Sequence, residues 1–142
     1  MARDTQQEPS FADRLCAATN SHDVDRVVGC FAEDYRNETP AHPARGFTGH
    51  EQVRRSWTQI FAGVPDLIAQ VVRSDQHGDT CWSEWEMRGT RVDGGAHLMR
   101  GVVVFTLAGG RAAAARFYLE PVDHAAVDAD EAVRRVLTEE RR

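Results

Sequence analysis

The sequence contains no lysine, and arginine supplies every basic side chain other than histidine. The absence of lysine excludes Schiff-base chemistry and the lysine of phosphate-binding loops. Acidic residues outnumber basic ones, and the formal net charge of the chain is −5. Such a chain has no long-range positive field that would attract a phosphate backbone or an anionic lipid surface. Nucleic acid and membranes are therefore not expected partners.

Cysteine is scarce, and histidine forms no ligand pattern. The three cysteines, Cys16, Cys30 and Cys81, are an odd number, lie far apart and include no Cys-x-x-Cys pair. They predict neither a disulfide framework nor a zinc site. His42 and His97 are single histidines without the spacing of metal ligands. We therefore expect no metal ion and no cofactor.

Long apolar runs are absent as well. The N-terminus carries polar residues such as Arg3, Asp4 and Gln6 where a signal peptide needs an apolar run. No stretch approaches the roughly 18 apolar residues that suggest a membrane-spanning helix. The 142 residues match the usual size of one domain. These features predict a cytoplasmic protein with a single core.

The first half of the chain contains three helical patterns. Apolar residues recur at helical spacing over residues 11–18, 24–31 and about 49–62. The second pattern runs through Phe31, and the third ends before Pro65, which cannot continue a helix. The apolar positions are Phe11, Leu15 and Ala18, then Val24, Val27, Val28 and Phe31, then Val53, Trp57, Ile60 and Phe61.

From Leu67 onward the apolar period changes from near four to two, which is typical of strands. Glycines at 94–95 and 109–110 supply the positive-φ positions that tight hairpins require. Helices followed by consecutive hairpins favour an α+β fold, with helices packed on one face of an antiparallel sheet. The predicted strands cover residues 67–74, 79–91, 97–107 and 111–120.

The two ends of the chain differ from this central region. We expect residues 1–9 to be a flexible N-terminus and residues 10–122 to form the domain. The segment 123–142 is rich in Asp, Glu, Ala and Arg and has few large apolar side chains. It is a charged tail that either forms a marginal helix or frays.

The strand faces carry the main functional signal. On segment 79–91, Trp82, Glu84, Glu86 and Arg88 share one side, and Cys81, Ser83, Trp85 and Met87 share the other. On the last strand, Arg116, Tyr118 and Glu120 share a side in the same way. In one interpretation the charged face is exposed and the apolar face packs on the helices, as in most half-exposed antiparallel sheets. In the other, the charged face lines a cavity under the helices.

A carboxyl group in an apolar cavity has a raised pKa because its charged form is desolvated, and it can then act as a general acid or base. A neighbouring tyrosine can donate a hydrogen bond to a developing oxyanion, and an arginine can hold a carboxylate or enolate. Tyr35 and Asn37 lie on an extended segment, since Pro40 keeps Thr39 out of the helical region, and they point the same way. Ordinary edge hydrogen bonding is the alternative role for this pair.

The order of helices and strands resembles the nuclear-transport-factor-two-like superfamily, and the local sequence resembles its SnoaL-like branch over about residues 10–122. No single motif is specific, but their order makes the resemblance informative. Its carriers are Phe31-Ala32-Glu33-Asp34-Tyr35, Pro43 to Gly49, Val64-Pro65-Asp66, Glu84-Trp85-Glu86-Met87-Arg88-Gly89-Thr90 and Phe117-Tyr118-Leu119-Glu120.

The resemblance implies a conical α+β barrel of cystatin-like topology, with a deep pocket and a homodimer formed through the sheet. The superfamily includes polyketide cyclases, steroid isomerases, dehydratases, limonene-type epoxide hydrolases and plain ligand binders, so the fold does not decide the function. In the cyclases an acidic residue near the end of the last long strand is the acid and base, and Glu120 is the nearest match. In the epoxide hydrolases a stretch like Tyr35, Asn37 and Pro40 positions the attacking water.

These observations predict a cofactor-free enzyme of secondary metabolism that acts on an apolar carbonyl compound by cyclisation, isomerisation or dehydration. Epoxide ring opening and non-catalytic binding of a small hydrophobic ligand are the alternatives. The predicted catalytic residues are Glu120, Glu86, Glu84, Tyr118 and Tyr35. The predicted substrate-binding residues are Asn37, Trp57, Phe61, Trp82, Arg88, His97, Met99 and Arg116.

Overall fold

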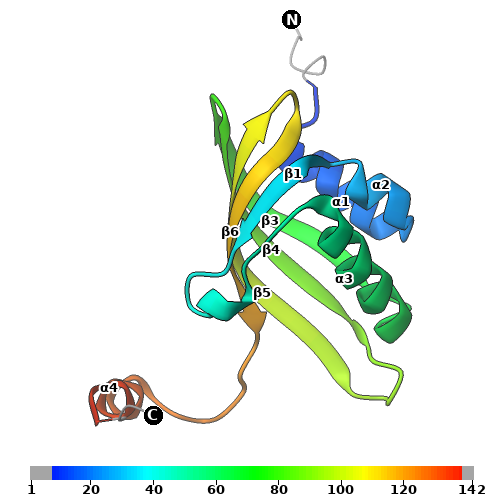
Figure 1. Cartoon of the computed structure of the whole chain (residues 1–142). Coiled ribbons are helices and arrows are strands. Elements are labelled where there is room, and N and C mark those ends of the chain that lie inside the picture. The colour runs from blue at the N-terminus through cyan, green and yellow to red at the C-terminus, as the bar shows by residue number, and fades with distance from the viewer. Residues whose placement is uncertain (1–7, 139–142) are drawn as a thin grey trace, which may run out of the picture.

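A computed structural model describes residues 8–138 of the chain (Figure 1). The predicted α+β class is confirmed: helices and a single curved sheet form the domain. The elements are α1 (Phe11–Ser21), α2 (Val24–Val28), β1 (Phe31–Glu38), the 3₁₀ turn η2 (Pro43–Arg45), β2 (Phe47–Thr48), α3 (His50–Gly63), β3 (Ile68–His77), β4 (Thr80–Thr90), β5 (Ala96–Ala108), β6 (Arg111–Pro121) and α4 (Ala129–Thr138).

The sheet has six strands in the order β2-β1-β6-β5-β4-β3. Strands β3 to β6 form the predicted meander, with antiparallel pairs throughout. β1 runs parallel to β6, and α3, which follows β2, carries the chain from this edge of the sheet to β3 at the opposite edge. Because β2 and β3 are both edge strands, the sheet curves without closing into the barrel that the resemblance implies.

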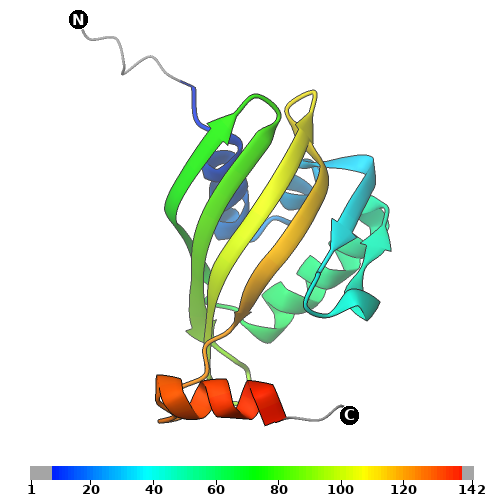
Figure 2. The same cartoon turned by 90° about the vertical axis from the view of Figure 1, so that its left-hand side faces the viewer.

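Three helices cover one face of the sheet, which we call the inner face (Figure 1). α1 begins after Ser10, whose Oγ accepts a hydrogen bond from the Asp13 amide at 3.1 Å, as the sequence predicts for an N-cap. It ends at His22 in the left-handed conformation, with φ of 59°. Phe11 and Leu15 of α1 are buried in the core beneath it. The opposite, outer face of the sheet is free of these three helices (Figure 2).

The second helix is shorter than its apolar pattern predicts. α2 ends at Val28, and Phe31 begins β1 instead of completing a helical stripe. The amide of Cys30 donates to the carbonyl of Val27, which tightens the chain at the helix end. Phe31 then pairs with Ala112 of β6. The prediction of a helix through Phe31 is therefore wrong. The apolar spacing correctly indicates that Phe31 is a core residue, but it does not show whether a helix or a strand carries it.

The apolar strand face packs on the helices, and the charged face points outward. Ser83 and Trp85 of β4 are buried, whereas Trp82 is 56% exposed. The interpretation in which the charged face lines a cavity under the helices is therefore wrong. The physical reason is that helices with apolar stripes stabilise the domain by covering apolar surface, so the apolar sheet face is the one they cover.

The C-terminal tail continues the chain beyond the sheet. Residues 129–138 form α4, which lies on the outer-face side of the sheet near the end of β6 and has no buried residue (Figures 1 and 2). Most of the N-terminus predicted to be flexible, residues 1–7, lies outside the described residues, as do 139–142. None of the helices within residues 8–138 has both the length and the hydropathy that a membrane-spanning helix needs.

Candidate functional site

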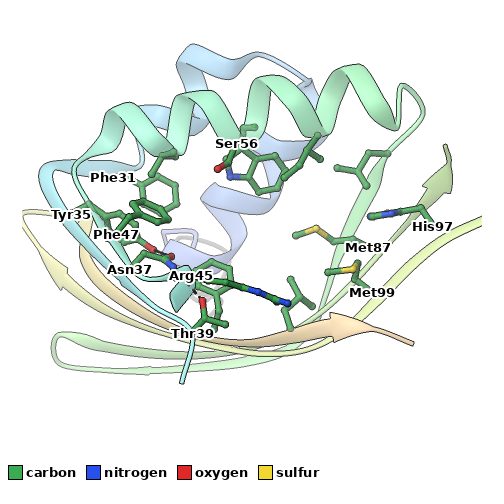
Figure 3. A pocket seen from close by; sticks show the side chains of 16 residues that line it. Phe31, Tyr35, Asn37, Thr39, Arg45, Phe47, Ser56, Met87, His97 and Met99 are labelled. Atoms are coloured by element: carbon green, nitrogen blue, oxygen red, sulfur yellow. Dashed lines mark hydrogen bonds between the residues drawn. The ribbon is translucent and has the colours of Figure 1, made fainter. Parts of the chain in front are cut away.

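A cavity of about 380 Å³ lies between the inner face of the sheet and α3 (Figure 3). Its volume is in the range of pockets that enclose small organic ligands. Side chains of β1, α3 and the inner face of β4, β5 and β6 form its wall, and the loop through η2 and β2 borders one end. The lining residues are Phe31, Tyr35, Asn37, Thr39, Arg45, Phe47, Val53, Ser56, Trp57, Ile60, Leu67, Met87, His97, Met99, Phe117 and Leu119.

The polar end of the cavity is a short hydrogen-bonded chain on β1. Tyr35 and Asn37 are 1% and 8% exposed, and their side chains point the same way, as the sequence predicts for alternate strand residues. The Tyr35 hydroxyl donates to Asn37 Oδ1 at 2.7 Å, and Asn37 Nδ2 donates to Thr39 Oγ1 at 3.5 Å. Burial raises the pKa of the Tyr35 hydroxyl far above its ordinary value, so it remains a protonated donor.

Arg45 and His97 are the lining residues with basic side chains. Arg45 is the last residue of η2, and its side chain extends along the cavity from the Thr39 end (Figure 3). His97 is half-buried on β5 and lies toward the other end of the cavity, beyond Met87 and Met99. An imidazole nitrogen can accept or donate a proton, so His97 is the lining group whose side chain is suited to proton transfer.

The rest of the wall is apolar. Trp57 and Ile60 face it from α3, and Phe117 and Leu119 face it from β6. No carboxylate is among the described residues that line this cavity. A ligand here is therefore surrounded mainly by hydrocarbon and aromatic surface, where each hydrogen-bonding group has a large influence on specificity.

The predicted second carboxyls lie outside the cavity. Glu84 and Glu86 are on the outer face of β4, where Glu84 pairs with Arg73 and Glu86 pairs with Arg88 and Arg100. The hydrogen bond from Arg88 and the charges of both arginines lower the pKa of Glu86, which is the opposite of the shift that a general acid near neutral pH requires. Arg88 is thereby engaged in an exposed ion pair and does not face the cavity.

The predicted residues of the last strand also face outward. Arg116 pairs with Glu38, and Tyr118 is 43% exposed. Glu120 Oε2 lies 3.3 Å from His42 Nε2, at the loop that precedes η2. These three side chains and Trp82 are not among the lining residues.

The structure thus brings Tyr35, Asn37, Trp57, His97 and Met99 of the predicted site together and leaves the others outside. Phe61 lies next to the lining, where it stacks on His22 with ring centroids 4.6 Å apart. Several lining residues were not predicted. Those on strands, Met87, Phe117 and Leu119, share the apolar face of their strands, so alternation would identify them once that face is assigned to the cavity. Arg45 ends the three-residue turn η2 and Phe47 begins the two-residue strand β2, and segments this short have no apolar period that would identify them.

Comparison with known proteins agrees with this architecture. A family model described as a SnoaL-like domain matches residues 12–115. A protein of ketosteroid isomerase-like fold from Catenulispora acidiphila, solved with trimethylamine, is 16% identical, with a TM-score of 0.69 over 89% of this chain and 95% of that one. A provisionally assigned ketosteroid isomerase from Kribbella flavida is 20% identical, with a TM-score of 0.64 over 92% and 86%. A cystatin-fold protein from Novosphingobium aromaticivorans is 23% identical, with a TM-score of 0.62 over 78% and 98%.

At these identities the solved structures establish the fold and not an activity. Among curated proteins, none matches the sequence. The family model covers most of the chain, from α1 into β6, and includes much of the cavity wall. The chain therefore belongs to the SnoaL-like domain family.

Proposed function

We propose that the protein binds a small, largely apolar molecule whose carbonyl or other acceptor oxygen lies at the Asn37 end of the cavity. The observation that carries this proposal is that Asn37 Nδ2 and the Arg45 guanidinium offer hydrogen-bond donors at this end of an otherwise mainly apolar wall. Burying a ligand there removes apolar surface from water, which stabilises the complex by roughly 25 cal/mol per Å².

The donor character follows from the hydrogen bonds of β1. Asn37 Oδ1 already accepts from Tyr35, so the amide presents Nδ2 to the cavity. The bond from Nδ2 to Thr39 is long at 3.5 Å, which leaves its protons available to a ligand. A guanidinium has donors only, so Arg45 adds no acceptor. A bound oxygen that accepts a hydrogen bond satisfies this end, whereas a hydrocarbon leaves it unsatisfied.

Acid–base catalysis on a bound carbonyl compound is the second candidate function, and the observation that favours it is His97. The imidazole is the lining group that can accept a proton from a carbon next to a carbonyl at its own end of the cavity. Isomerisation is the simplest such reaction, because the proton returns to the same carbon skeleton. Epoxide ring opening has less support, because none of the residues within 8–138 that line the cavity beside Tyr35 and Asn37 is a carboxylate that could activate water.

Binding is tested with 2-tetralone and with tetralin, which has the same skeleton without the carbonyl. We expect 2-tetralone to bind about five- to tenfold more tightly, since a net hydrogen bond contributes about 1 kcal/mol. The double substitution Tyr35→Phe and Asn37→Leu removes the hydrogen-bond donor and its acceptor together, so neither is left buried and unsatisfied. It should abolish the preference for 2-tetralone over tetralin. Calorimetry measures both affinities.

Gln70→Leu, an amide-to-aliphatic change at an exposed position of β3, is the matched control and should keep the preference. Equal affinities in the unaltered protein would contradict the role of the donors. The same samples in D₂O separate the two candidate functions. If 2-tetralone recovered from the protein sample contains no more deuterium than 2-tetralone kept in buffer, the protein only binds the ketone. If the protein accelerates deuterium exchange and His97→Gln abolishes that acceleration, the protein catalyses proton transfer.

We also propose that the outer face pairs two copies of the chain, as the resemblance implies. Trp82 and Tyr118 expose 56% and 43% of their surface there, among charged side chains of both signs. Sedimentation velocity should give a dimer that Trp82→Glu weakens at least tenfold, because the substitution removes a large aromatic contact and buries an added charge at the interface. A monomer in the unaltered protein at micromolar concentration would contradict the proposal.

A further inference from the structure

We propose that the natural ligand of the cavity is a carboxylic acid, bound as its anion, and that Arg45 holds the carboxylate. The inference rests on the proposed function, since it names the polar group of the molecule that the cavity binds. It depends on where the backbone places Arg45, on the absence of a carboxylate partner for its charge among residues 8–138, and on the chemistry of the surrounding donors.

The backbone holds Arg45 beside the polar end of the cavity. The amide of Arg45 donates to the carbonyl of His42 at 2.9 Å, and that of Gly46 donates to Pro43 at 3.2 Å, which fixes the turn. The next residue, Phe47, pairs with Asn37 across β1 and β2. At Gly46 the chain lies so close that an added Cβ would be 3.2 Å from the Asn37 carbonyl oxygen. The side chain of Arg45 therefore begins next to the Asn37 strand and runs along the edge of the cavity (Figure 3).

Arg45 has no carboxylate partner among residues 8–138. Of the acidic side chains on the neighbouring strands, Glu38 pairs with Arg36 and Arg116 on the outer face, and Glu120 Oε2 lies 3.3 Å from His42 Nε2. The chain has a net charge of −5, yet this cavity is lined by an arginine and by no described carboxylate. Its local charge is thus opposite to that of the whole protein.

A monoanion with two equivalent oxygens fits this arrangement. The planar guanidinium presents paired donors that match a carboxylate, and one positive charge balances one negative charge. A doubly charged phosphate would leave a charge uncompensated beside an apolar wall. Asn37 Nδ2 offers a further donor next to the arginine, and the apolar part of the acid extends along Trp57, Phe117 and Leu119.

The test uses a series on one skeleton: 1,2,3,4-tetrahydro-2-naphthoate, its primary amide and tetralin. We expect the acid to bind about tenfold more tightly than the amide at low salt, because a hydrogen bond between charged partners is stronger than a neutral one. Arg45 is exposed at the edge of the cavity, so added salt should weaken binding of the acid and leave the amide unchanged.

Arg45→Met should lower the affinity for the acid to that for the amide, and should change the affinity for tetralin less than twofold. Arg45→Lys should recover part of the difference, since an ammonium keeps the charge but not the paired donors. Arg26→Met, at an exposed position of α2, is the matched control and should leave the series unchanged. Equal affinities for acid and amide would overturn this inference alone, whereas failure of 2-tetralone, tetralin and the whole series to bind would overturn the proposed function.

Discussion

Gly101→Ala is expected to lower the free energy of unfolding by about 3–5 kcal/mol. Gly101 lies on β5 with φ of +154°, where side chains other than hydrogen are strained by roughly 1–3 kcal/mol. An added Cβ would collide with the Tyr118 carbonyl oxygen and stand 2.7 Å from the Cα of Leu119. Because these are backbone atoms of β6, relief requires the strands to separate, which adds an overpacking cost of about 1–3 kcal/mol. Urea denaturation measures the change.

Two further glycines separate the causes of this loss. Gly109→Ala keeps a positive φ, at 62°, but its Cβ would meet nothing within 4 Å, so only the strain of about 1 kcal/mol should remain. Gly63→Ala at the end of α3 has open space and no positive φ, and should be neutral or slightly stabilising. If Gly101→Ala costs no more than Gly109→Ala, the close approach of β5 to β6 has no energetic importance.

The close approach at Gly101 also bears on the cavity. Gly101 is in register with Trp85 of β4 and Leu119 of β6, and all three positions belong to the inner face. Two residues before it is Met99, and two further is His97, both of which line the cavity. Because Gly101 has no side chain, β5 and β6 can approach each other closely beside the cavity. Gly101→Ala would force these strands apart, and we therefore expect it to weaken ligand binding as well.

The sequence was sufficient to predict the meander because several local signals agree there. The period of two along each strand is reinforced by hairpin glycines, and Gly94, Gly109 and Gly110 adopt the positive φ values of 91°, 62° and 80° that the turns require. The parallel pairing of β1 with β6 was not predictable in this way. It joins segments about 80 residues apart, and no local pattern specifies a partner at that distance.

The candidate site was predicted only in part, for a related reason. Tyr35 and Asn37 could be placed together because two residues of a strand always share a face. The charged residues Glu84, Glu86, Arg88 and Arg116 share their strand faces with Trp82 and Tyr118, and that mixture is compatible with a cavity as well as with an exposed face. Alternation groups side chains into two faces but does not say which face the helices cover. That choice is made by packing of the whole domain, and here it favours the apolar face.

Trp85→Ala is expected to destabilise the protein by about 3–5 kcal/mol, the range for truncating a buried large aromatic residue. Trp85 is 1% exposed and is among the largest fully buried side chains. Its Nε1 donates to Ser83 Oγ at 2.8 Å, and Ser83 Oγ donates in turn to the Val103 carbonyl at 2.7 Å, so the indole is bound to both β4 and β5. Removing it leaves a void on the inner face of the sheet that the surrounding strands cannot fill completely.

Trp82→Ala is the matched control, since it makes the same truncation on the same strand three residues earlier, on the outer face. In the isolated chain it should cost no more than about 1 kcal/mol, because the indole is already more than half exposed. Trp85→Phe tests the hydrogen bond separately: most of the packing remains, and a loss of about 1–2 kcal/mol is expected. Equal midpoints for Trp82→Ala and Trp85→Ala in urea would mean that the two sheet faces are equivalent. The assignment of the apolar face to the core, and with it the placement of the cavity, would then be wrong.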